Sequence, residues 1–183
     1  MHVVVGFSKC GQVSLHQYLI NRYGKNNVGR DEIIHAYNGL EKFEERWGDK
    51  NPIPVIITRD PIQRCWSWYY YLGYDNQMPY EEFVKIKEYK GSYGEINPIS
   101  ISNYAKWIRP WIKKYNCMFY MLDYLKKDPL FPHLNSTLDF RKKPVPPMPK
   151  HYQELTKKLL CEEIKTNKEP SWSYLPNTVL GKI

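Results

Sequence analysis

The sequence contains no run of about 18 apolar residues, the length that a membrane-spanning helix needs. It enters a β-branched stretch at once, without the basic and then apolar segments of a secretory signal. Cysteine is scarce and widely spaced, with no C-x-x-C pair: the four are Cys10, Cys65, Cys117 and Cys161. These absences predict a cytoplasmic protein with reduced thiols and without a membrane span, a disulfide framework or a zinc site.

Internal repeats and low-complexity tracts are also missing, and a length of 183 residues predicts a single domain over 1–183. A hydrophobic content of 42% excludes a disordered chain. The net charge of +8 predicts an anionic partner. Nucleic acid is one candidate, but the basic residues are spread along the chain apart from 141–143 and the lysines of the last third, so charge alone does not decide and a nucleic-acid partner is not expected. An enzyme for anionic substrates carries the same surplus.

Short β-branched runs alternate with amphipathic stretches along the chain. The strands are expected at 2–7, 31–37, 54–60 and within 117–125. The helices are expected at 13–23, 39–48, 61–72, around 80–89, at 101–115 and at 150–165, with a kink or a division at Pro110. This alternation predicts an α/β fold of three layers with a mainly parallel central sheet. Ligands of such folds bind beyond the carboxyl ends of the strands.

The stretch VVVGFSKCGQVSLHQYL, residues 3–19, has the pattern of a buried strand, a turn and an amphipathic helix. Such a helix start attracts phosphate, because its N–H groups and its dipole favour anions. Gly6 and Gly11 are spaced as in a triphosphate-binding loop, but Gln12 and Val13 then replace the usual lysine and magnesium-binding hydroxyl. The lysine stands earlier, at Lys9. Read alone, the stretch fits either an unusual phosphate loop or an ordinary connection with a surface lysine.

A second stretch, TRDPIQRCWSWYY, lies at 58–70 and places an arginine at a strand end. Asp60 is a favourable N-cap and Pro61 a favourable first helical residue. Arg59 and Ser67 have the donors to hold a phosphate together, through a planar guanidinium and a hydroxyl. Read alone, the stretch also fits an N-capped helix that follows an exposed arginine.

In this order the two stretches resemble the sulfotransferases that use 3′-phosphoadenosine 5′-phosphosulfate (PAPS), and in motif style they are nearer the carbohydrate or Golgi-type members. The likeness extends to residues 104–129 and covers about two thirds of the chain. The resemblance implies a P-loop-like fold in which Arg59 and Ser67 hold the 3′-phosphate, and no metal is required. The residues that it assigns to the 5′-phosphosulfate are Lys9, Cys10, Gly11, Gln12, Val13 and Ser14.

The resemblance also implies catalytic roles. Lys9 matches the family's catalytic lysine, which stabilises negative charge on the oxygen that leaves sulfur. The family places a His or Glu base after the first helix, and here DEIIHAYN offers Glu32 and His35. In related glycan enzymes the base is a Glu two residues before the His, where this chain has Ile33. His35 is favoured because its ordinary pKa, near 6.5, suits a base at neutral pH.

The expected function is therefore transfer of a sulfuryl group from PAPS to a hydroxyl of a small-molecule or carbohydrate acceptor, with 3′,5′-adenosine bisphosphate as the product. Cys10, Gln12 and Val13 depart from the family's usual loop. The late Lys-Gly segment that wraps the adenosine has no secure match, which leaves the basic residues at 141–143 in its place.

Two alternatives and one further hypothesis accompany this reading. The alternatives are a kinase with an altered loop and a non-catalytic module that binds a polyanion. The tyrosines that follow the second stretch are candidates for lining the acceptor site: Tyr69, Tyr70, Tyr71, Tyr74 and Tyr80.

Overall fold

The computed structural model of the 183-residue chain describes residues 1–30, 35–37, 39–87, 90–91, 94–95, 97–132 and 144–166. These residues belong to two compact units. The first takes in Met1–Arg59 and 107–132, and the second takes in Asp60–Lys106 and 144–166.

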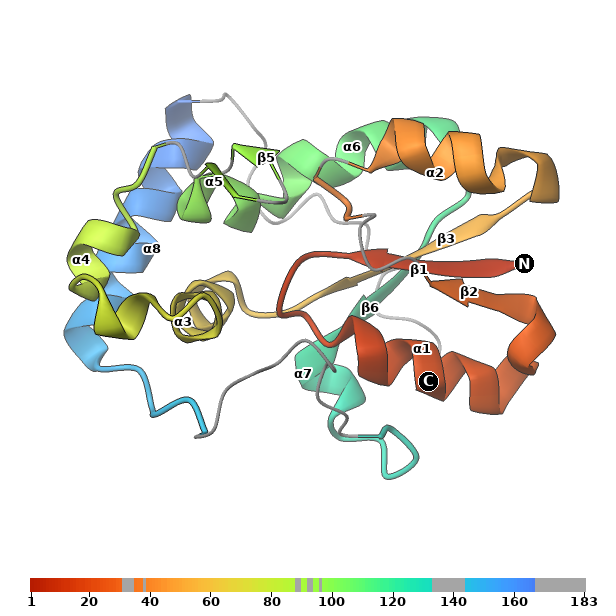
Figure 1. Ribbon diagram of the computed structural model, residues 1–183, viewed down its shortest axis with the longest axis horizontal. Helices are drawn as coiled ribbons and strands as arrows, with labels where there is room; N and C mark the ends of the chain where they lie inside the picture. The colour runs from red at the N-terminus through yellow and green to blue at the C-terminus, as the bar shows by residue number, and fades with distance from the viewer. Residues whose placement is uncertain are drawn as a thin grey trace. The chain divides into compact units, whose positions relative to one another are not determined.

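The first unit is built on a four-stranded parallel sheet (Figure 1). Its strands, in the order β2-β1-β3-β6, are β1 (His2–Gly6), β2 (Val28–Arg30), β3 (Ile53–Thr58) and β6 (Met118–Met121). The central strands are apolar without alternation, as a parallel sheet covered on both faces requires. Their fully buried residues include Val3, Val4, Val5, Val55, Ile56 and Ile57.

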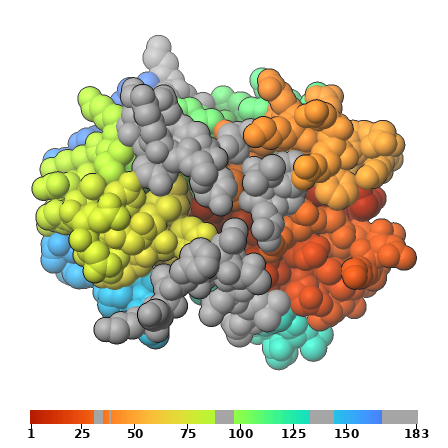
Figure 2. All heavy atoms as spheres, in the orientation of Figure 1, coloured from red at the N-terminus to blue at the C-terminus, as the bar shows by residue number. Residues whose placement is uncertain are grey.

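Helices cover both faces of this sheet. The chain leaves β1 through α1 (Gln12–Tyr23) to reach β2 on one side, and returns through α2 (Leu40–Trp47) to β3 on the other side of β1. Because such crossovers are right-handed, this reversal of direction places α1 and α2 on opposite faces, as Figure 1 shows. In Figure 2 the atoms of α1 and α2 form much of the visible surface of the unit. The predicted α/β class is confirmed.

The second unit is mainly helical. Its elements are α3 (Pro61–Tyr71), the 3₁₀ turn Tyr74–Asn76, α4 (Tyr80–Phe83), a hairpin of β4 (Lys90–Gly91) and β5 (Gly94–Glu95), α5 (Pro98–Ser102) and α8 (Lys150–Thr166). α3 begins as the sequence predicts: an Asp60 carboxylate oxygen accepts from the Gln63 N–H at 2.8 Å, and Pro61 takes the first helical position. Helix α6 (Tyr104–Lys114) follows α5 along the chain.

A fully buried arginine joins α3 to α5 in the second unit. Arg64 has no exposed surface, and its Nη2 and Nε donate to the Ser102 hydroxyl at 2.7 and 3.1 Å. Nη2 also donates to the Pro98 carbonyl at 2.6 Å, and the guanidinium lies over the Trp68 ring. Neutral oxygens and an aromatic face therefore solvate this charge, and the loss of one of them leaves a buried cation short of partners.

Three expected elements differ from those observed. The strand expected at 31–37 is found at Val28–Arg30; residues 35–37 lie outside any strand, and 31–34 fall outside the described residues. The helix expected at 101–115 is divided at Asn103 and continues through Pro110. The first part, α5, begins earlier than expected because Asn97 caps it by accepting from the Ile99 and Ser100 N–H groups, and it ends where Asn103 leaves the helical conformation with ψ 73°. The helix expected around 80–89 is limited to α4.

The remaining expected elements agree with the structure. α7 (Leu122–Leu125) follows β6, and short 3₁₀ turns lie at Lys25–Asn27 and Gly48–Lys50. In the described ranges, none of the helices combines the length and the apolar character that crossing a membrane requires.

The Arg64 cluster predicts a large effect of one hydroxyl on stability. Ser102→Ala removes an acceptor from two buried guanidinium N–H groups and should lower the free energy of unfolding by about 3 kcal/mol in urea denaturation. Ser100→Ala, two residues earlier on a partly exposed side chain, is the matched control and should cost less than about 0.5 kcal/mol. Similar losses in the two variants would contradict a structural role for the cluster.

Candidate active site

The loop after β1 folds as a tight turn with a lysine in an unusual backbone conformation. The Cys10 N–H donates to the Phe7 carbonyl at 3.1 Å, and Lys9 has φ 67°. A β-turn with a positive φ at its third residue normally has glycine there. A residue with a β-carbon pays for this backbone with about 1–2 kcal/mol of strain. Strain of this kind is concentrated at functional sites, and among the described non-glycine residues Lys9 shares a positive φ with Asn51 alone.

Gly11 is the N-cap of α1 and allows the loop to lie close to Leu122. Its φ is 84°, and a β-carbon built on it would lie 2.7 Å from a methyl group of Leu122. Gly11 has no side chain that could accept from the first N–H groups of α1, which have no acceptor within the helix. Left-handed residues followed by a helix start form a concave set of N–H donors suited to an anion.

The predicted phosphate-binding residues differ in what they offer. The Cys10 N–H is committed to the turn, and its side chain is fully buried. Ser14 is also buried, in the first turn of α1. The N–H groups of Gly11, Gln12 and Val13 lie at the start of α1, where the helix itself supplies no acceptor for them. The assignment of Cys10 and Ser14 to the phosphosulfate stays a prediction.

Arg59 reaches the same loop from β3. β1 and β3 are paired with Gly6 opposite Ile57, so the residues that follow them leave the sheet side by side. The Arg59 Nη1 donates to the Lys9 carbonyl oxygen at 3.1 Å across a separation of 50 residues. Within the described part of the chain, Arg59 Nε is buried and has no hydrogen-bond partner. The structure thus brings the guanidinium of one predicted motif to the backbone of the other, at the point where the strand order reverses and α/β folds bind ligands.

Other predicted residues are not joined to this pair by the structure. Ser67 lies in α3, in the second unit, and is 8% exposed. Its meeting with Arg59 stays a prediction. Glu32 and the basic residues at 141–143 lie outside the described residues.

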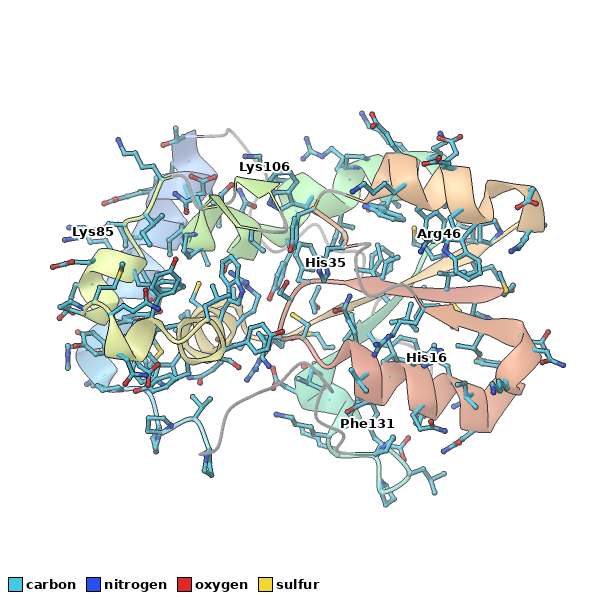
Figure 3. All side chains as sticks on the ribbon, in the orientation of Figure 1. His16, His35, Arg46, Lys85, Lys106 and Phe131 are labelled. Atoms are coloured by element: carbon cyan, nitrogen blue, oxygen red, sulfur yellow. The ribbon has the colours of Figure 1, made fainter. Side chains whose placement is uncertain are left out.

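His35 lies against the carboxyl end of β1, as Figure 3 shows. The next residue fixes it there: the Ala36 N–H donates to the Gly6 carbonyl at 2.9 Å, and the Trp111 indole N–H donates to the Ala36 carbonyl at 2.8 Å. The imidazole stacks on the Tyr37 ring, with 5.1 Å between centroids and 15° between planes. The candidate base is therefore adjacent to the strand that carries the phosphate loop.

Burial changes the acid–base chemistry of His35. The side chain is 6% exposed, and loss of solvation lowers its pKa to about 4, against the opposing effect of a hydrogen bond with the Gly6 backbone. The expectation of an ordinary pKa near 6.5 is wrong, because the sequence does not reveal that this residue is covered. A neutral imidazole at pH 7 is able to accept a proton, although a low pKa weakens the driving force.

Tyr37 and Ser8 were not identified as site residues from the sequence. The Ser8 hydroxyl and the Tyr37 hydroxyl are 3.2 Å apart, which joins the segment with His35 directly to the loop that follows β1. Both residues lie inside the stretches quoted for the motifs, but neither has a motif position that distinguishes it. Their contact arises from the pairing of distant segments.

The tyrosine hypothesis for the acceptor site fails at two of its positions. The Tyr69 hydroxyl donates to the Met78 carbonyl at 2.7 Å, and the Tyr80 hydroxyl lies 2.9 Å from that of Thr156. Both rings are buried within the second unit. They pack its core and are closed to an acceptor.

No group of three or more His, Cys, Asp or Glu side chains able to hold a metal ion occurs in the ranges that the structure describes. All four cysteines lie in those ranges, and none of them forms a disulfide.

The buried imidazole predicts a pH-dependent stability. The folded pKa of about 4 lies below the unfolded value near 6.5, so the unfolded chain binds the extra proton as the pH falls through this interval. The contribution of His35 to the free energy of unfolding should be fully present above pH 6.5 and should fall by about 3 kcal/mol by pH 4.

Urea denaturation of the parent and of His35→Gln between pH 7 and 4 measures how steeply the free energy of unfolding changes with pH in each protein. His151→Gln, an exposed histidine on α8, should keep the parental slope; a parental slope in His35→Gln would contradict the assignment.

Comparison with known proteins gives the fold its context. No family model matches the sequence, and no curated protein matches it. The chain is similar in structure to a sulfotransferase from Alicyclobacillus acidocaldarius, with a TM-score of 0.64 and 14% sequence identity over 90% of this chain and 92% of that one. At this identity the likeness is one of architecture: the protein has a sulfotransferase-like α/β fold.

Proposed function

We propose that the protein is a PAPS-dependent sulfotransferase that transfers a sulfuryl group to a hydroxyl of a carbohydrate or small-molecule acceptor. The observation that carries this proposal is the contact between Arg59 Nη1 and the Lys9 carbonyl oxygen. It brings two motifs that the family uses for opposite ends of one ligand to the same edge of the sheet. The sulfotransferase-like fold supports the same function.

The residues present fit a ligand with two anionic ends. The N–H groups of Gly11, Gln12 and Val13 and the ammonium of Lys9 suit the 5′ end, and the first turn of α1 contains no acidic residue to oppose an anion. The buried Nε of Arg59 is a donor in need of an acceptor, and a 3′-phosphate would supply one. Ser67 is proposed to add a hydroxyl at the 3′ end.

The chemistry then follows from the charges that develop during transfer. When bound, PAPS supplies the sulfuryl group, whose bond to the phosphate oxygen breaks as the acceptor hydroxyl attacks, leaving 3′,5′-adenosine bisphosphate. Lys9 would stabilise the charge that appears on that oxygen, an interaction stronger in the transition state than before it. The acceptor proton would pass to a base. His35 is the described candidate, and Glu32 is the alternative for this role.

A requirement for metal is not part of the proposal. Gln12 and Val13 occupy the positions where a triphosphate loop has its lysine and its magnesium-binding hydroxyl. The Lys9 ammonium and the backbone N–H donors at the start of α1 are proposed to bind the anion in place of a metal ion.

The proposed function predicts ligand selectivity in calorimetric titration. The parent protein should bind 3′,5′-adenosine bisphosphate with an affinity that magnesium changes by less than about twofold, because only protein donors hold it. ATP with magnesium should bind more weakly. The reverse order would indicate a kinase. No binding of either nucleotide, with salt-sensitive binding of polyanions, would indicate the non-catalytic alternative.

The role of Lys9 predicts a loss of rate larger than the loss of affinity. Lys9→Ala should lower kcat by about 100-fold or more, since the ammonium acts on charge that develops in the transition state, and it should change bisphosphate affinity by less than about tenfold. Release of the bisphosphate from PAPS with a panel of phenol and sugar acceptors measures turnover. Lys25→Ala, an exposed lysine just beyond α1, is the control for lost charge. Equal losses of rate and affinity would contradict the assigned role.

A further inference from the structure

The hydrogen bond between Arg59 and the Lys9 carbonyl links the two motifs and holds the backbone of the proposed catalytic lysine. Lys9 is held in the left-handed region at φ 67°, which disfavours any residue with a β-carbon. Its peptide carbonyl receives a charge-assisted hydrogen bond from Nη1 of Arg59 at 3.1 Å. This hydrogen bond helps to hold the turn in a backbone conformation that is unfavourable for lysine.

The guanidinium has a second edge that faces away from this bond. An arginine is a planar fork, and its Nε and Nη2 form the parallel pair of donors that phosphate accepts in a bidentate manner. Nη1 is the group already engaged with the loop. Nε is buried and, among the described residues, has no hydrogen-bond partner. The same side chain is therefore equipped to hold the loop with one edge and an anion with the other.

We infer that Arg59 is a positioning residue for Lys9 as well as a ligand of the 3′-phosphate, so that occupancy of the 3′ end fixes the catalytic lysine at the 5′ end. This inference rests on the proposed function. A 3′-phosphate bound to Nε and Nη2 holds the guanidinium in the plane that keeps Nη1 on the Lys9 carbonyl. Because coupling between two sites is reciprocal, the 3′-phosphate and the 5′-phosphate must each strengthen the binding of the other through this arginine.

The arrangement also predicts that the protein discriminates between sulfuryl donors with and without a 3′-phosphate. A nucleotide without a 3′-phosphate loses its contact with Arg59 and, in addition, meets a loop whose arginine is less firmly held. Discrimination then appears in the rate as well as in the affinity, because a displaced lysine stays displaced when the site is saturated.

Adenosine 5′-monophosphate is the probe that separates the two roles, since it lacks the 3′-phosphate. Calorimetric titration of Arg59→Ala should show affinity for the monophosphate about tenfold weaker than in the parent, and affinity for 3′,5′-adenosine bisphosphate weaker still, because a charge-assisted bond to the loop is lost in both cases. Ser67→Ala should weaken the bisphosphate alone and leave the monophosphate within about twofold. Arg46→Ala, an exposed arginine at the end of α2, is the charge-matched control.

Turnover supplies a readout that a purely structural role would not move. At saturating PAPS, Arg59→Ala should retain a kcat about tenfold below the parent, whereas loss of a 3′-phosphate contact alone would raise KM and spare kcat. Arg59→Lys, which keeps the charge but lacks the two-edged fork, should restore the melting temperature without restoring kcat. It also provides the measurement if the alanine variant fails to fold.

The outcomes distinguish this inference from the function on which it rests. If the parent binds the bisphosphate and Arg59→Ala leaves monophosphate affinity and kcat at parental values, the coupling is refuted and the sulfotransferase proposal stands. If the parent binds neither nucleotide, the proposed function itself is overturned. Weakened monophosphate binding and a lowered kcat in Arg59→Lys, at the parental melting temperature, support the inference.

Discussion

The pairing of β1 with β3 is the constraint on which the candidate site depends. Parallel neighbours end at the same edge of a sheet, and the register that sets Gly6 against Ile57 delivers the next residues of both strands to one place. A loop of little intrinsic stability thereby meets an arginine 50 residues away. The hydrophobic burial of the valine and isoleucine runs supplies the free energy that holds this register, so the core determines the geometry of the chemistry.

The segment 35–37 shows the same dependence on tertiary contacts. A backbone hydrogen bond from Ala36 to the end of β1, and an indole hydrogen bond from Trp111 to Ala36, help to hold a histidine and a tyrosine beside the loop that follows β1. The cost is the desolvation of the imidazole, seen in its lowered pKa. Burial that positions the imidazole also lowers its pKa, and the hydrogen bond with the Gly6 backbone offsets only part of that effect.

Much of the fold could be predicted from the sequence, because its strongest signals are local. The apolar run of β1, the Asp60–Pro61 helix start and the glycine after α1 each act through neighbouring residues, and each is found where expected. Predictions failed where a distant contact decides. The burial of His35 and the internal hydroxyl bonds of Tyr69 and Tyr80 depend on partners that no local pattern reveals. The early start of α5 is the exception, since its cause, the Asn97–Pro98 helix start, is a local signal that the apolar spacing of residues 101–115 outweighed.

The left-handed backbone at Lys9 bears on how this chain would respond to selection for robustness alone. Conformational preference at that position favours glycine, which adopts the same angles without strain. Selection for thermal stability alone would therefore favour replacement of Lys9 by glycine. The resulting protein would fold well but would lack the lysine in the loop before α1. If Lys9 has the proposed catalytic role, that role and the stability of the fold favour different residues at this position.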